Sequence, residues 1–150
     1  MINHLTTEVS LFLSPGLVAP VDWPSLRRPS SPNTYLMAPP GFTSAAADAT
    51  APSFNMPIET LMQRWDAMIA RQPRVAKKAK TDDGLQIDYV QRTLFMRFPD
   101  WITVRFIPAG RDRATLAIYS RSVYGYSDLG VNKARVQSWV AGLQDESASG

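Results

Sequence analysis

The stretch LQIDYVQR, residues 85–92, alternates apolar and polar side chains with a period of two, and WITVRFI, residues 101–107, repeats the pattern. This alternation is typical of strands with one buried face. Similar segments cover 74–80 and 114–123. Turn-forming residues separate the four segments: Asp82-Asp83-Gly84, Phe98-Pro99-Asp100 and Pro108-Ala109-Gly110. The sequence therefore predicts four antiparallel strands in a meander.

The same alternation assigns the side chains of these strands to two faces. The face predicted to carry the core holds Leu85, Ile87, Tyr89, Ile102, Val104, Phe106, Leu116 and Ile118. The opposite face holds Gln86, Asp88, Val90, Arg92, Trp101, Thr103, Arg105, Tyr119 and Arg121. Its arginines and aromatic rings can bind carboxylates, phosphates or stacked bases. They can equally form a solvated outer face, and both interpretations stay open.

Two amphipathic helices flank the strands. One begins after Pro57 and ends near Gln72, before Pro73, and its apolar stripe is Ile58, Leu61, Met62, Trp65 and Ile69. The other runs from about Leu129 to Leu143, with Leu129, Val136, Trp139, Val140 and Leu143 on one face. Both helices need an apolar surface. The predicted fold class is therefore α+β: a two-layer sandwich of a curved antiparallel sheet of four to five strands with both helices on one face.

Prolines divide the chain into unequal parts. Nine of the twelve prolines lie in residues 1–57, where they oppose long helices and central strands. An alanine-rich connector at 45–51 precedes Pro52, and residues 53–56 could add a short edge strand. The predicted division is a proline-rich extended or disordered arm at 1–51, a compact α+β domain at 52–144 and a disordered tail at 145–150.

The composition disfavours several kinds of chemistry. The chain has no cysteine, and its one histidine, His4, lies near the terminus, so thiolate nucleophiles, zinc–thiolate sites and histidine bases are disfavoured. We expect no metal and no cofactor. The missing side chains argue against an enzyme, although that question stays open. Twelve of the sixteen basic residues are arginine, which suits carboxylate or phosphate, while the net charge of +3 is too small to favour nucleic acid.

The most apolar stretch, residues 9–21, is interrupted by Pro15 and Pro20 and is shorter than the about 20 apolar residues that cross a bilayer. It also lacks the basic front region of a signal peptide. We therefore expect a soluble, cytoplasmic protein. The apolar residues Leu11, Phe12, Leu13, Leu17 and Val18 leave open a weak contact with a membrane surface, against an ordinary packed or mobile tail.

The most distinctive motif is SRSVYGYSDLGVN, residues 120–132, which precedes a basic helix. Further motifs are Pro32-Asn33, Leu36 to Pro40, Leu94-Phe95 and Phe98-Pro99-Asp100. From about Arg28 to Leu143 the sequence resembles the family called domain of unknown function 1499, found in bacteria and plastids. The resemblance implies a small α+β domain, often behind a membrane anchor or export signal, with no established activity. This chain differs in having no matching anchor, no cysteine near Asn33, and Val123 where a basic residue is common.

The motif also suggests local roles. Ser127 or Asp128 can cap the last helix by accepting a hydrogen bond from an N–H two or three residues on, and Asn132 can bond back to the preceding loop. The helix start, with Arg121 and Lys133 or Arg135, could instead bind an anion. Capping is favoured because the carboxylate of Asp128 already suits the positive helix end.

These observations predict a non-catalytic binding or scaffold domain for an unknown protein partner. The alternative is a pocket for a small amphipathic or anionic ligand between the sheet and the C-terminal helix. The candidate ligand-binding residues are Arg92, Trp101, Arg105, Tyr119, Arg121, Ser127, Asp128 and Asn132.

Overall fold

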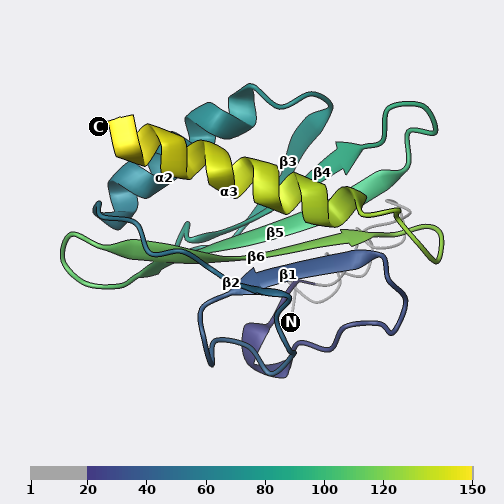
Figure 1. The fold of residues 1–150 in the computed structure, drawn as a ribbon, viewed down its shortest axis with the longest axis horizontal. Helices are drawn as coiled ribbons and strands as arrows, with labels where there is room; N and C mark the ends of the chain where they lie inside the picture. Colours follow the sequence, from purple (N-terminus) through teal and green to yellow (C-terminus); the bar gives the residue numbers. More distant parts are fainter. Residues whose placement is uncertain (1–19, 150) are drawn as a thin grey trace.

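The computed structural model describes residues 20–149, with side chains up to residue 144. A six-stranded sheet in the order β2-β1-β6-β5-β4-β3 forms the centre of the fold. Its strands are β1 (Thr34–Ala38), β2 (Ala49–Thr50), β3 (Val75–Lys80), β4 (Gln86–Arg92), β5 (Pro99–Pro108) and β6 (Ala114–Ser122). Helices α2 (Ile58–Ala70) and α3 (Val131–Ser149) both cross one face of the sheet (Figure 1). The predicted α+β architecture with two helices on one face is therefore confirmed.

The sheet is larger than predicted, and it is mixed rather than entirely antiparallel. β1 pairs antiparallel with β6 and parallel with β2, whereas β3 to β6 form the predicted antiparallel meander. β1 fits between Pro32 and Pro39, where the intervening residues keep their backbone N–H groups. Asp48 joins β2 to β1, since its backbone N–H donates to the carbonyl of Leu36 and its carboxylate accepts from the N–H of Leu36. The prediction of four to five antiparallel strands was wrong on these two points.

The face covered by the helices carries the main core. Trp65 lies at its centre, with ring centroids 5.6 Å from Phe106 and 5.9 Å from Trp139, both edge-on. Of the predicted inward residues, all but Leu85 belong to this buried cluster: Ile87, Tyr89, Ile102, Val104, Phe106, Leu116 and Ile118. These side chains fill the centre of the space between α3 and the sheet, while an open groove of about 430 Å³ remains at its edge, lined by Gln91 and Arg92 of β4 and by Val131, Ala134 and Trp139 of α3.

The last helix begins later than predicted. Leu129 is 94% exposed and precedes α3 in a left-handed conformation, with φ of 54°, and Gly130 follows with φ of 83°. Consecutive residues at positive φ cannot continue a right-handed helix. Leu129 therefore does not belong to the apolar face, whereas Val136, Trp139, Val140 and Leu143 are buried as predicted. α3 also extends to Ser149, into the segment predicted to be a disordered tail.

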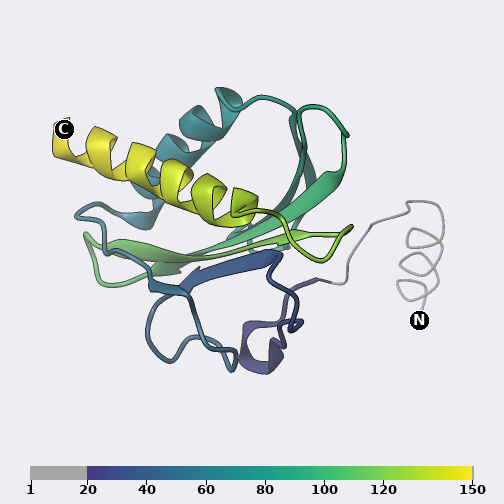
Figure 2. The same ribbon diagram turned by 45° about the vertical axis from the view of Figure 1, so that its right-hand side comes forward.

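The opposite face of the sheet is partly covered by residues 20–45 (Figure 2). Trp23 lies in the short 3-10 helix η1 (Trp23–Ser25), packs 5.7 Å from Phe42 and donates its indole N–H to Gln86 at 2.9 Å. Leu36, Ala38, Ala117 and Tyr119 complete this second cluster. The structure thus differs from the predicted division at residue 51, because residues before that point pack on the sheet and form part of it.

The two edges of the sheet are protected in different ways. β2 has two paired residues, and β3 carries Lys77, Lys78 and Lys80 with exposed side chains. Short or charged edge strands oppose pairing with another chain. No helix within residues 20–149 is long and apolar enough to span a membrane. The apolar residues between 11 and 18, for which the sequence left open a weak contact with a membrane surface, lie outside the described residues.

Candidate functional site

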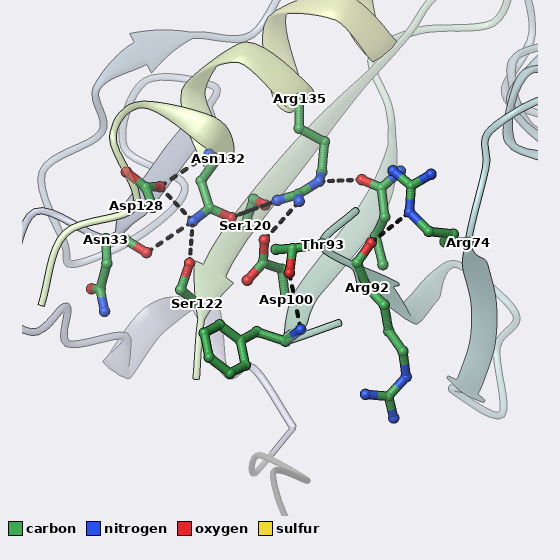
Figure 3. A network of polar contacts seen from close by, with 12 residues as sticks. Asn33, Arg74, Arg92, Thr93, Asp100, Ser120, Ser122, Asp128, Asn132 and Arg135 are labelled. Atoms are coloured by element: carbon green, nitrogen blue, oxygen red, sulfur yellow. Dashed lines mark hydrogen bonds and ion pairs between the residues drawn. The ribbon is translucent and has the colours of Figure 1, made fainter. Parts of the chain in front are cut away.

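A buried polar network lies where the first turns of α3 meet the ends of β4, β5 and β6 (Figure 3). Arg135 is its centre, and its Nη2 donates to the Asp100 carboxylate at 2.7 Å. The side chains of Arg135 and Asp100 are 5% and 3% exposed. Arg135 also donates from Nε to the Gln91 side chain and from Nη1 to Ser120 Oγ and Asn132 Oδ1, at 3.0 and 2.7 Å. Each guanidinium nitrogen of Arg135 therefore has a partner.

Asn132 extends this network to two further segments (Figure 3). Its Nδ2 donates to the backbone carbonyl of Asn33 at 3.0 Å, to Ser122 Oγ at 2.9 Å and to Asp128 Oδ2 at 2.6 Å. The Asn33 amide in turn donates to the carbonyl of Gly125 at 2.8 Å. Asn132 therefore ties together the segment before β1, the end of β6 and the β6–α3 loop, which confirms that it bonds back to the preceding loop.

The start of α3 is capped from within the chain. Asp128 accepts hydrogen bonds from the backbone N–H groups of Gly130 and Asn132, at 2.9 and 3.0 Å. Ser127 Oγ accepts from the N–H of Leu129 at 3.3 Å. The predicted cap is present, and the carboxylate of Asp128 takes the position that an anion would need at this helix end.

The polar atoms of the network are satisfied by one another. Among the described side chains, no buried polar nitrogen or oxygen lacks a hydrogen-bond partner. Ser120 is fully buried between Asn132 and Arg135 and has no base beside it that would activate its hydroxyl. A buried ion pair adds little net stability, but removing one partner leaves the other charge buried and uncompensated, which is costly. The pair of Arg135 and Asp100 therefore fixes the position of α3 relative to the start of β5.

The predicted site residues on the helix-free face do not converge on one cavity. Arg105 forms an ion pair with Asp83 at 2.8 Å, and this contact holds the pKa of the exposed Asp83 carboxyl well below its ordinary value. Arg92 is exposed and donates to the carbonyl of Arg97 at 2.9 Å. Trp101 is buried at 4% exposure. These three side chains therefore do not form a shared pocket.

Tyr119 and Arg121 are brought together. The Arg121 guanidinium lies 4.9 Å from the centroid of the Tyr119 ring, and its Nη1 donates to Thr103 Oγ1 at 3.1 Å and to the carbonyl of Tyr119 at 3.2 Å. Burial lowers the pKa of Arg121 and raises the pKa of Tyr119. Both residues line an open groove of about 320 Å³ beside residues 20–27.

Sequence reasoning missed four inner members of the polar network, Asn33, Gln91, Asp100 and Ser120, and named Arg135 only for an alternative anion site at the helix start. A signal for three of them was present. The alternation that places Tyr89, Ile102 and Ile118 on the inner face, extended by one step toward the same end of the sheet, reaches Gln91, Asp100 and Ser120. The prediction ended where the apolar residues ended, although the buried face continues.

The outside of the same end of the sheet carries an apolar surface. Phe98 and Tyr124, from the β4–β5 and β6–α3 loops, lie with ring centroids 5.7 Å apart. These two loops emerge at the same end of the sheet (Figure 1). We define the apolar tip as Leu94, Phe95, Met96, Phe98, Tyr124, Tyr126, Leu129 and Val131, with exposures from 42% to 94%. Within residues 20–144, these are all of the exposed large hydrophobic side chains.

Backbone strain is concentrated at the same end. Among the described residues, the non-glycine residues with positive φ are Arg74, Arg97 and Leu129, at 57°, 59° and 54°. Arg97 and Leu129 belong to the two loops of the apolar tip, and Arg74 donates from Nε to the carbonyl of Arg92 beside it (Figure 3). Left-handed conformations are unfavourable for such residues and persist where the surrounding structure imposes them.

Neither a curated protein nor a solved structure matches this chain. One family model matches it, over residues 29–143. That range includes the polar network, the cap of α3 and both loops of the apolar tip. The match confirms the resemblance noted from the sequence motifs and covers more than half of the chain. The chain belongs to the family described as protein of unknown function (DUF1499).

Proposed function

We propose that this protein is a non-catalytic docking domain that binds the surface of an anionic lipid bilayer through the apolar tip. The observation that carries this proposal is the position of the exposed large hydrophobic residues, all of which, within residues 20–144, lie in two adjoining loops or, for Val131, at the first residue of α3. Contiguous apolar patches on a folded surface commonly mark protein or membrane contacts. Moving the apolar tip out of water therefore lowers the free energy of the system.

The shape of the tip favours a bilayer over a protein partner. Phe95 is 88% exposed and Leu129 is 94% exposed, so these side chains project from loop ends instead of lining a groove. Projecting apolar side chains can enter the boundary between headgroups and acyl chains. Tyr124 and Tyr126 have the apolar ring and polar hydroxyl that suit this boundary.

The charges around the tip complement an anionic surface. Arg92, just before the β4–β5 loop, and Arg97, within it, are exposed, and Lys133 is exposed on the first turn of α3. The nearby acids are engaged internally, since Asp100 is paired with Arg135 and Asp128 accepts from backbone N–H groups. Each basic side chain near an anionic leaflet contributes about 1 kcal/mol.

The polar network supports this function by holding the loops of the tip. Asn132 binds Ser122 at the end of β6 and Asp128 in the β6–α3 loop, and Arg135 binds Asp100 just after the β4–β5 loop. Loops that are ordered before binding lose less conformational entropy when they bind. The buried network thus serves docking without any chemical step.

Vesicle co-sedimentation of the full chain tests docking. Vesicles of phosphatidylcholine mixed with phosphatidylglycerol should bind the protein more tightly than phosphatidylcholine alone. Phe95→Ser and Leu129→Ser should each weaken binding roughly tenfold or more, because burying one large apolar side chain contributes about 1.5–3 kcal/mol.

A matched pair of charge variants provides the control. Arg97→Gln and Lys78→Gln each remove one exposed positive charge, at the tip and on the edge strand β3 respectively. Arg97→Gln should weaken binding to the anionic vesicles about fivefold, and Lys78→Gln should leave it unchanged. Equal binding by Phe95→Ser and the unmodified chain, or no binding to either vesicle, would contradict membrane docking.

A further inference from the structure

The structure has two buried arginines with very different surroundings. Arg135 has a carboxylate partner in Asp100 and hydrogen bonds from all three guanidinium nitrogens. Arg121 is 8% exposed, yet none of the ion pairs among the described residues includes it. A buried cation without a facing anion is unfavourable unless something compensates its charge.

The guanidinium of Arg121 also keeps unused donors. Its two hydrogen bonds, to Thr103 and to the carbonyl of Tyr119, both come from Nη1. Nε and Nη2 make no hydrogen bond with the described residues. Neither atom is fully enclosed by protein, so both keep some exposure to solvent. These two nitrogens form the edge of a guanidinium that suits bidentate binding of a carboxylate or phosphate.

Arg121 is also one of the residues that line the groove beside residues 20–27. The groove is lined by Tyr119 and Arg121 from β6, and by Pro20, Val21, Asp22, Ser25, Leu26 and Arg27 from the segment that covers this face. We infer that this groove binds a small oxyanion, carboxylate or phosphate, with the group held by the Nε–Nη2 edge of Arg121. Pro20, Val21 and Leu26 give it an apolar wall for a small attached group.

The local charges agree with this assignment. Arg27 is exposed on the rim and adds a second positive charge. Asp22 also lies on the rim, but its carboxylate accepts from Ser25 Oγ at 2.5 Å. The Asp88 charge attracts Arg121 from a distance but forms no ion pair with it, because the Asp88 carboxylate accepts from the Thr103 hydroxyl, which lies between them. An oxyanion at the unused edge would supply the direct partner that neither aspartate provides.

The site is separate from the docking surface proposed above. The apolar tip belongs to loops 93–98 and 123–130 and to the first residue of α3, whereas the groove lies on the helix-free face between β6 and residues 20–27. The oxyanion can come from a soluble metabolite or from a lipid headgroup, since both present the same chemistry to an arginine. Loss of one binding activity need not affect the other.

Nuclear magnetic resonance of arginine Nε–H signals in the full chain tests the site. On titration with inorganic phosphate, and separately with butyrate, the Arg121 signal should move and saturate with a Kd of about 1 mM for at least one of the two. The Arg135 signal is the internal control and should stay in place, because its donors are already used.

Three variants separate the site from general charge effects. Arg121→Gln should abolish saturable binding, whereas Arg105→Gln should keep it, because Arg105 is paired with Asp83 elsewhere on the same face. Arg27→Gln changes an exposed side chain and should reduce affinity about threefold with the fold intact, so it serves if Arg121→Gln does not fold. An Arg121 signal that does not move, or Arg27→Gln and Arg121→Gln that titrate like the unmodified chain, would overturn the inference.

Vesicle binding distinguishes the two sources of the oxyanion. If phosphate binds and Arg121→Gln keeps its affinity for anionic vesicles, the ligand is a soluble oxyanion. If phosphate binds and the same variant loses vesicle affinity while Arg105→Gln does not, the ligand is a lipid phosphate. Vesicle binding that depends on Phe95 but not on Arg121 leaves docking and the oxyanion site as independent properties.

Discussion

At the scale of single residues, the ion pair between Arg135 and Asp100 shows how a polar group is accommodated in the interior of this fold. Asp100 lies two residues before Ile102 on the same inner face of β5. This position therefore places a carboxylate on a face that otherwise carries apolar side chains. The free-energy cost of burying the Asp100 carboxylate is offset by its ion pair with Arg135 of α3.

Asp100→Asn should lower the free energy of unfolding by about 3–5 kcal/mol, because it leaves the Arg135 charge buried without its carboxylate. Urea unfolding followed by fluorescence measures the change. The double variant Asp100→Leu with Arg135→Met should recover part of the loss, because it removes both charges together. A loss below about 1 kcal/mol for Asp100→Asn would contradict a buried, paired carboxylate.

A second residue, Tyr89, makes the stability of the core depend on alkaline pH. Its hydroxyl accepts the indole N–H of Trp65 at 2.9 Å, and burial raises the pKa of Tyr89 to about 12. The unfolded chain ionises Tyr89 near its ordinary pKa of 10.0, so this contribution to stability is complete below that pH and is lost as the pH rises through 12.

Urea unfolding across this alkaline range should therefore show a falling stability that Tyr89→Phe makes shallower. Tyr124→Phe is the matched control, because Tyr124 is exposed, and it should leave the slope unchanged. Identical slopes for the unmodified chain and Tyr89→Phe would show that Tyr89 ionises as readily in the folded state as in water.

At the scale of elements, the junction between β6 and α3 depends on one carboxylate. Asp128 receives two backbone N–H groups and the Asn132 amide, whereas Ser127 receives one N–H at 3.3 Å. The junction also contains two consecutive residues at positive φ, Leu129 and Gly130, which the cap holds in place.

Asp128→Ala should reduce the free energy of unfolding by about 1–2 kcal/mol, because N-cap substitutions cost roughly this much and a network partner is lost as well. Ser127→Ala should cost a few tenths, which makes the pair a direct comparison of two neighbouring cap residues. Chemical denaturation measures both. Equal losses for the two variants would show that Asp128 is not the principal cap.

Periodicity alone predicted the elements that bury one face. The meander of β3 to β6 and both helices follow from it, because their apolar residues recur at the spacing of a strand or a helix. β1 was missed because proline content was averaged over a long segment, whereas a strand needs only the short interval between Pro32 and Pro39. The polar network was missed because buried positions were predicted from apolar residues alone. Hydrogen bonds between side chains of β4, β5, β6 and α3 also depend on the tertiary structure, which the periodicity of one segment does not predict.

At the scale of the whole molecule, three surfaces of the sheet are used differently. The helices cover one face, residues 20–45 cover part of the other, and the apolar tip lies at one end (Figure 2). The covering segment is held by Trp23, which is 4% exposed and bonded to Gln86. It also forms one side of the groove at Arg121.

Trp23→Ala should destabilise the protein by about 3 kcal/mol, because truncating a buried tryptophan leaves a cavity and leaves Gln86 Oε1 without its donor. Trp23→Phe, which keeps most of the ring volume, should cost less than half as much. Equilibrium unfolding by urea gives both values. A loss within about 0.5 kcal/mol for Trp23→Ala would mean that residues 20–45 are a dispensable arm.

Docking of the apolar tip onto an anionic bilayer can be measured directly, because the chain has no cysteine. An environment-sensitive fluorophore can be attached to the single thiol of Phe95→Cys, Leu129→Cys or Lys78→Cys. With anionic vesicles, the probes at positions 95 and 129 should shift to shorter emission wavelengths, as in an apolar medium, while the probe at 78 stays aqueous. Probes at all three positions that respond alike, or tip probes that remain in an aqueous environment, would contradict docking through the apolar tip.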